Sequence, residues 1–161
     1  MSELISNQSK KIKNKVEVIT TWCDSKKIKP NSTSDHISAF YDFFSTACEI
    51  AGDKNCEETD GISFLSELLG HKQTKHEYLC WEYPASGGLQ AIRMGKWKGI
   101  KRNLFKTNSK LELYDLNIDE KELNDVANLN PKVVDELEAK LKEAHSTPFL
   151  NEFIIPNLEQ D

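Results

Sequence analysis

The spacing of apolar residues changes from helical to strand-like near residue 77. Before that point, two segments show helical spacing. The first begins at Asp42, which can cap a helix, and ends at Ala51, where Gly52 can adopt the left-handed conformation. The second is short, from Ile62 to Leu69, and stops at Gly70. These patterns predict two short amphipathic helices. The apolar stripe of the first consists of Phe44, Ala47, Cys48 and Ala51.

Beyond Glu77, apolar and polar residues alternate and turn residues separate the segments. The predicted strands are residues 78–83, 89–94, 97–102 and 111–116. Four strands this close together predict an antiparallel meander. The alternation of Ala91 with Ile92, and of Trp97 with Lys98, predicts one buried and one solvated face.

A last helix is predicted from Pro131 to Ala144, with Asn130 as its cap. It should cover the apolar face of the sheet, so a charge at Leu137 should detach it. Its apolar residues are Val133, Val134, Leu137, Leu141 and Ala144. The tail beyond Pro148 must either fold back or meet another surface. Its apolar residues are Phe149, Phe153, Ile154 and Ile155.

Residues 1–26 are expected to be a disordered or divergent lead-in with one possible strand, Val16–Trp22. A turn at Lys29–Ser34 and a strand at His36–Tyr41 should follow. Residues 27–156 then form one subdomain, and residues 157–161 are a tail. The expected fold class is α+β: a four-stranded antiparallel sheet covered by a long C-terminal helix, preceded by two shorter helices and a stray strand.

Composition and charge exclude several classes of function. The 161 residues carry a formal net charge of -5, and 38% are hydrophobic, which is typical of a soluble globular protein. Arg93 and Arg102 are the only arginines, so nucleic acid is not an expected partner. No apolar run is long enough to span a membrane, and residues 1–15 lack the apolar stretch of a signal peptide. A cytoplasmic location is therefore expected.

The cysteines and histidines suggest no metal or catalytic site. The four cysteines have no C-x-x-C pair and no zinc spacing with any histidine. They are expected to be free thiols, with a Cys48–Cys56 disulfide only if the chain is exported. No histidine has a nucleophile or carboxylate at a recognisable spacing, so no catalytic residue is predicted. The residues considered are Cys23, Cys48, Cys56, Cys80, His36, His71, His76 and His145.

Several strings occur in the order found in one enzyme family. YLCWEYPASGG and LQAIRMGKWKGIK resemble a W-E, glycines, Q-A-x-R-x-G-x-W-K segment, and LELYDL resembles x-E-L-Y-D-L. Upstream, SDHISAFYDFFSTACEIAG and DGISFLSELLG resemble two further segments of the family. From roughly Lys27 to Pro156, the chain resembles the C-terminal subdomain of the formylglycine-dependent sulfatases (arylsulfatases) of the alkaline-phosphatase-like superfamily.

The sequence departs from that family at the catalytic groups. Intact relatives use calcium and a formylglycine made from a cysteine or serine in a C/S-x-P/A-x-R string. No cysteine of this chain begins such a string, and the acidic pairs Glu57-Glu58 and Asp119-Glu120 lack the context of the calcium ligands. The resemblance therefore implies a truncated or split sulfatase, inactive alone, with no cofactor in this chain. A separately encoded catalytic domain is the implied partner.

The resemblance also implies that the turn after Trp81-Glu82 faces a sulfated sugar or aryl group. Tyr83, Gln90 and Arg93 are the candidate substrate-binding residues: a flat ring, an amide and a bidentate cation. The alternative is structural, with Arg93 paired to Glu82 across strands and with Trp81 and Trp97 in the core. A second functional hypothesis is a non-catalytic module that binds a partner protein or an anionic, sulfated glycan.

Overall fold

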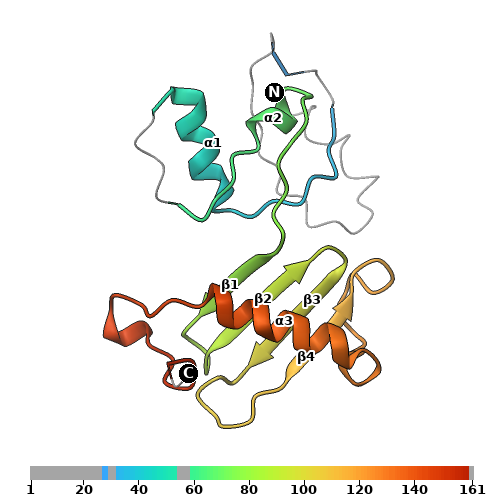
Figure 1. Cartoon of the computed structure of the whole chain (residues 1–161), viewed down its shortest axis with the longest axis vertical. Coiled ribbons are helices and arrows are strands. Elements are labelled where there is room, and N and C mark those ends of the chain that lie inside the picture. Colours follow the sequence, from blue (N-terminus) through green and yellow to red (C-terminus); the bar gives the residue numbers. More distant parts are fainter. Residues whose placement is uncertain (1–26, 29–31, 54–58, 160–161) are drawn as a thin grey trace, which may run out of the picture.

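The computed structural model describes residues 27–28, 32–53 and 59–159. A four-stranded sheet covered by one long helix forms the larger part, and a smaller part contains two short helices (Figure 1). This arrangement confirms the predicted α+β class. Within the described residues, no helix has the length and apolar character needed to cross a membrane.

The sheet is an antiparallel meander in the order β1-β2-β3-β4. Its strands are β1 (Leu79–Tyr83), β2 (Leu89–Met94), β3 (Trp97–Arg102) and β4 (Leu111–Asp115). β2 and β3 have the predicted bounds, whereas β1 and β4 are each one residue shorter. Gly95, with a φ of 57°, makes the tight turn between β2 and β3.

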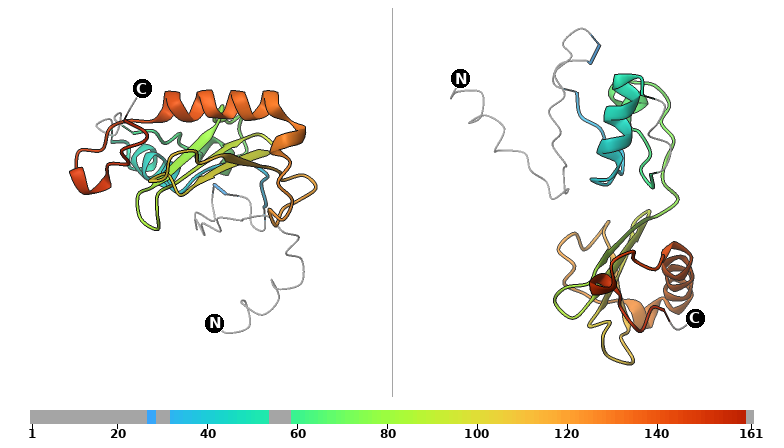
Figure 2. Two further views of the ribbon diagram at one scale, coloured as in Figure 1. Left: turned by 90° about the horizontal axis from the view of Figure 1, so that it is seen from below. Right: turned by 90° about the vertical axis from the view of Figure 1, so that its left-hand side faces the viewer.

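Helix α3 (Pro131–Ala144) lies across one face of the sheet (Figure 2). Pro131 occupies the start of the helix, as predicted. The predicted side-chain cap is wrong: the Asn130 amide donates to the Val126 carbonyl at 3.0 Å, while the Asn130 backbone oxygen accepts from Val133 and Val134. The core between helix and sheet consists of Ile92, Leu111, Leu113, Leu137 and Leu141.

The sheet face away from α3 is not simply solvated, contrary to the sequence-based expectation. The strand register places Leu79, Arg93, Lys98 and Tyr114 in one row across this open face. Leu79 and Tyr114 are nevertheless buried. The loop after β4 returns toward this face, since Glu122 pairs with Lys98 at 2.5 Å. Alternation within the strands could not reveal that a loop and large side chains cover part of the second face.

The smaller part contains α1 (Asp42–Ala51) and α2 (Leu65–Leu68). Gly52 ends α1 with a φ of 70°, as predicted, and Gly70 follows α2 with a φ of 74°. Helix α2 is shorter than the predicted 62–69. The predicted apolar stripe of α1 is wrong in part, because Cys48 is buried but Phe44 is 59% exposed.

Two predictions near the start of α1 are also wrong. Asp42 is the first residue of the helix rather than its cap, and residues 36–39 form no strand. One cause accounts for both: the Asp42 carboxylate accepts the Ala39 N–H at 2.7 Å, so this N–H is not available to a strand partner. The strand Val16–Trp22 lies outside the described residues, as does the first half of the turn Lys29–Ser34.

The C-terminal tail folds back in part. Short 3₁₀ turns, η1 (Ala127–Leu129) and η2 (Asn151–Phe153), lie before α3 and within the tail. Ile155 folds back and is buried, whereas Phe149 is fully exposed. The fold-back is therefore confirmed at Ile155, and contact of the tail with another surface stays a prediction.

Candidate functional site

The β1–β2 turn (residues 84–88) and the β3–β4 loop (residues 103–110) lie at the same end of the sheet, hereafter the hairpin end (Figure 1). The backbone N–H groups of Leu104 and Phe105 donate to the carbonyls of Gly88 and Gly87, each at 3.2 Å. From the tail, the Asn157 amide donates to the Leu104 carbonyl at 2.7 Å. Three segments distant in sequence thus fix one another here.

Glycine is required at one point of this end. Gly88 has a φ of 79°, and a Cβ added there would lie 2.9 Å from the Cβ of Leu104. Since Leu104 is buried, the loop cannot simply move away from an added methyl group. Gly88 therefore allows the close approach of the turn and the loop.

Tyr83, the first of the predicted site residues, stands at the hairpin end and is 56% exposed. Tyr83 pairs with Leu89, and Leu89 pairs with Arg102, so these three side chains share a row on the open face. Tyr83 and Arg102 are two strands apart, about 10 Å at ordinary strand spacing. An aromatic ring and a guanidinium group are thus presented on the same face.

Gln90 lies on the other face of the sheet and is only 2% exposed. Its amide donates to the Glu82 carboxylate at 2.6 Å. Glu82 also lies 3.0 Å from Nδ1 of His145, whose Nε2 is 3.2 Å from Glu159. This buried amide fixes the Glu82 carboxylate on the face toward α3, and the contacts of His145 connect that carboxylate to Glu159 in the tail.

Arg93 is separated from both other candidates. It pairs with Leu79, toward the opposite end of the strands from Tyr83, and its Nε donates to the Gly95 carbonyl at 3.3 Å. Burial lowers the pKa of the Arg93 guanidinium. The alternative pairing of Arg93 with Glu82 is wrong, because the two side chains lie on opposite faces. Of the tryptophans, Trp97 packs against the core, while Trp81 is half-exposed on the open face.

A basic pocket of about 340 Å³ lies in the β3–β4 loop. Its lining residues are Arg102, Asn103, Lys106, Thr107, Asn108, Ser109, Lys110 and Glu112. Arg102 is held by Glu112 at 3.0 Å, and Glu112 accepts a further hydrogen bond from the Tyr114 hydroxyl at 2.9 Å. The hydrogen bond that Arg102 donates to Glu112 raises the pKa of the guanidinium, so this cation is permanent.

Sequence reasoning missed this pocket. The segment KRNLFKTNSK does show clustered basic and small polar residues, but it follows a strand and reads as an ordinary loop. Positive φ angles at Asn103 and Asn108, 57° and 76°, curl the loop so that its side chains converge. That curvature was not visible in the residue pattern.

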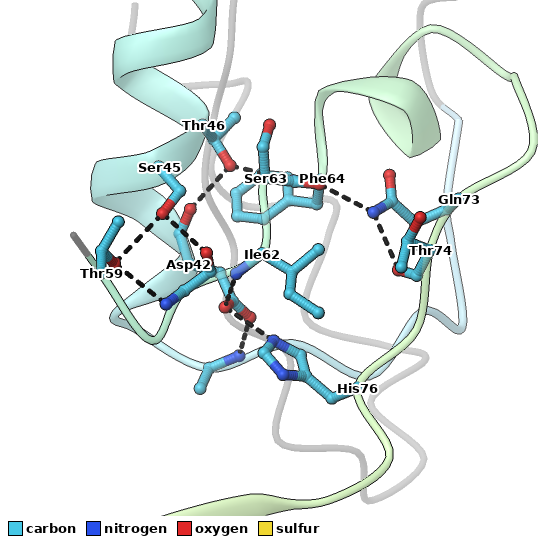
Figure 3. A network of polar contacts seen from close by, with 12 residues as sticks. Asp42, Ser45, Thr46, Thr59, Ile62, Ser63, Phe64, Gln73, Thr74 and His76 are labelled. Atoms are coloured by element: carbon cyan, nitrogen blue, oxygen red, sulfur yellow. Dashed lines mark hydrogen bonds and ion pairs between the residues drawn. The ribbon is translucent and has the colours of Figure 1, made fainter. Parts of the chain in front are cut away.

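A second polar cluster surrounds the buried Asp42 (Figure 3). Its carboxylate accepts the N–H groups of Ala39 and Ile62 at 2.7 and 2.9 Å, and Nε2 of His76 lies 2.8 Å away. Thr46, also buried, donates to the Asp42 carbonyl and accepts the Phe64 N–H. Both oxygens of the Asp42 carboxylate and the Thr46 hydroxyl have protein partners, which is typical of a structural network rather than a catalytic one.

Neither cluster forms a metal centre: within the described ranges, no three His, Cys, Asp or Glu side chains are grouped to hold an ion. Cys80 is a free thiol whose pKa is raised to about 11, chiefly by burial and then by Glu82. The expectation of free thiols is wrong for Cys48, which is disulfide-bonded. Its partner falls outside the described residues, so the predicted pairing with Cys56 stays a prediction.

A protein-family model matches most of the chain. Residues 12–147 match the family model described as N-sulphoglucosamine sulphohydrolase, C-terminal. No curated protein matches the chain.

Solved structures give the same fold. A 2-O GAG sulfatase, BT1596, superposes with a TM-score of 0.55 at 27% identity, covering 62% of this chain and 22% of that protein. BT4656, solved with its substrate D-glucosamine-2-N,6-O-disulfate, has a TM-score of 0.66 at 22% identity, covering 84% and 28%. Ps i-CgsB, solved with k-i-k-neocarrahexaose, has a TM-score of 0.52 at 23% identity, covering 63% and 23%. The chain thus spans about a quarter of each.

Proposed function

Because the chain belongs to the family of sulfatase C-terminal domains named N-sulphoglucosamine sulphohydrolase, C-terminal, we propose that it forms one wall of a sulfate ester site. The activity served is sulfuric ester hydrolysis of a sulfated carbohydrate or aryl group. The hairpin end is the observation that carries this proposal. There an exposed tyrosine, a glycine turn and a basic pocket lie together on a fixed backbone.

The hydrolytic step itself is assigned to residues outside this chain. Neither arginine lies four residues after a cysteine or a serine, so no C/S-x-P/A-x-R string occurs and formylglycine has no source among the 161 residues. Calcium and formylglycine would come from a catalytic domain, in the same polypeptide or separately encoded. The chain alone is then inactive, and its contribution is to bind and orient the substrate.

Within the site, we assign direct contact to Tyr83 and an indirect role to Gln90. The exposed Tyr83 ring can pack on a sugar, whereas the buried Gln90 amide holds Glu82 on the opposite face and so fixes the strand pair that presents Tyr83. Direct contact by Arg93 is less favoured, because Arg93 lies toward the other end of the strands.

The surface of α1 supports a catalytic domain as the partner. Phe40, just before the helix, is 80% exposed and stacks on Phe43, with ring centroids 6.3 Å apart. With Phe44 and Ile50 also exposed, these side chains form an apolar face of the kind that marks protein interfaces. The disulfide at Cys48 favours an oxidising compartment over the cytoplasm.

Turnover of an aryl sulfate and of a sulfated disaccharide, each with calcium, tests this function. The purified chain should give none, and co-expression with a sulfatase catalytic domain that carries a C-x-P-x-R string should restore it. In that complex, Tyr83→Ala should lower kcat/KM about tenfold. Leu123→Ala, an exposed apolar residue away from the hairpin end, is the matched control. Turnover by the chain alone would overturn the proposal.

The alternative, a non-catalytic glycan-binding module, is favoured by one observation. The basic pocket requires no second domain for its shape, because all of its lining residues belong to this chain. Binding of sulfated glycan by the chain, without any gain of turnover in the co-expressed complex, would favour this function.

A further inference from the structure

We propose that the basic pocket is a sulfate-binding subsite that holds a sulfate group of a sulfated glycan. The inference rests on the proposed function for its ligand class and deepens it by naming a second contact point. That point is distinct from the sugar-facing Tyr83 and is formed by the β3–β4 loop.

The lining of the pocket is positively charged. Three cations, Arg102, Lys106 and Lys110, line the pocket with one carboxylate, Glu112, so its formal charge is positive in a chain whose net charge is -5. Within the described part of the chain, Arg102 pairs with Glu112, whereas no ion-pair partner faces either lysine. Two cations are thus left to bind an anion.

The neutral lining residues match an anion as well. Asn103, Thr107, Asn108 and Ser109 provide amide and hydroxyl donors around the lysines. A sulfate ester has a single negative charge spread over three terminal oxygens, which suits several donors of modest strength. A volume of about 340 Å³ is at the lower end of small-ligand pockets, enough for one sulfated sugar unit.

The loop is held in place before any ligand arrives. Leu104 is buried at its base, Lys106 N–H closes a turn onto the Asn103 carbonyl at 2.9 Å, and Asn157 holds the Leu104 carbonyl. A preorganised loop loses little entropy on binding. Since Arg102 shares a row with Tyr83, one glycan chain can contact both the ring and the pocket.

Calorimetry on the whole chain tests the subsite. The probes are a sulfated glycosaminoglycan disaccharide, the same disaccharide without sulfate, and inorganic sulfate. The sulfated disaccharide should bind, and its desulfated form should not. Lys106→Gln combined with Lys110→Gln should raise the dissociation constant roughly tenfold or more. Weaker binding of inorganic sulfate would show that the sugar also contributes, whereas equal binding would overturn the glycan as the ligand.

Lys121→Gln combined with Lys132→Gln is the matched control, because it removes two exposed lysines outside the pocket. If both double variants lose the same affinity, the interaction is general charge attraction and the subsite is wrong. If neither loses affinity, or the wild type does not bind, the subsite is equally wrong. Amide NMR shifts of the wild-type chain, expected at residues 102–112, provide a readout that does not depend on how the variants fold.

This test is separate from that of the proposed function. If the pocket does not bind sulfate, the co-expressed complex can still hydrolyse sulfate esters. Conversely, failure of that complex to hydrolyse any sulfate ester leaves binding by the pocket intact, as expected of the non-catalytic module.

Discussion

The two parts of this molecule are held together by different kinds of interaction. Between α3 and the sheet lies an apolar core, in which Ile92, Leu113 and Leu137 are fully buried. Around α1 and α2, the most buried side chains are Asp42 and Thr46, and hydrogen bonds join the segments (Figure 3). In the apolar core, a substitution should lower the free energy of unfolding in proportion to the apolar area lost. In the hydrogen-bonded part, removal of a single partner leaves buried polar groups unpaired and should be costly by itself.

The largest effect is expected in the apolar core. Leu137→Ala should lower the free energy of unfolding by about 2 to 5 kcal/mol, because the helix loses its central contact and a cavity remains. Leu137→Asp should detach α3 altogether. Urea denaturation measures both, and Leu129→Ala, on an exposed side chain just before the helix, is the control. A Leu137→Asp variant that keeps native stability would contradict the apolar interior described for this part.

A second test removes the centre of the polar network. Asp42→Ala leaves the N–H groups of Ala39 and Ile62, and the His76 ring, without their acceptor, at an expected cost of about 3 kcal/mol. Hydrogen exchange should then speed up in residues 39–76 but not in β2 and β3. Asp60→Ala, on an exposed carboxylate, is the control. Equal loss of protection from exchange in both parts would mean that they unfold together, and would contradict the view that each part is stabilised by its own kind of interaction.

The difference between the parts also explains what the sequence could predict. Burial of apolar side chains leaves a periodic pattern in the sequence. The alternation in residues 78–116 and the helical spacing from Pro131 therefore predicted the strands, their order and α3 to within one residue. Asp42 was read as a helix cap, since its partners at Ile62 and His76 are 20 and 34 residues away. Hydrogen bonds between residues so far apart leave no regular spacing in the sequence, so the sequence pattern does not predict them.

The candidate site shows the same contrast. The predicted strand bounds agree with the position of Tyr83 at the hairpin end, while its contact with substrate stays a prediction. The position of the basic pocket depends on loop curvature at Asn103 and Asn108. A residue pattern indicates that a loop exists, whereas its φ angles decide which side chains converge.

The hairpin end can be tested as an extension of the apolar part. Gly88→Ala forces a methyl group to within 2.9 Å of Leu104 Cβ and should cost about 2 to 4 kcal/mol. Gly95→Ala has a similar positive φ but no heavy atom within 4 Å of the added Cβ, so about 1 kcal/mol is expected. Thermal unfolding of the pair measures the difference. Equal losses would show that backbone strain alone matters and that the turn and loop are not tightly packed.

The smallest effect should appear where the two parts meet, at Tyr41. Its ring lies edge-on to His76 with centroids 6.0 Å apart, and Cys80 on β1 is among the groups that influence its pKa. Burial, followed by the nearby Asp42 carboxylate, raises the pKa of Tyr41 from 10.0 to about 12. The folded state therefore disfavours the phenolate.

A raised pKa on an acid means that its contribution to stability is complete below the unfolded value and is lost as pH rises toward the folded value. For Tyr41 the window runs from about pH 10 to about pH 12. The free energy of unfolding in urea, measured from pH 9 to 11.5, should fall less steeply in Tyr41→Phe than in the wild type. Tyr83→Phe, which changes an exposed tyrosine, should follow the wild type. If both variants flatten the curve equally, the alkaline loss comes from net charge, and Tyr41 is not the contact that makes the polar part depend on the sheet.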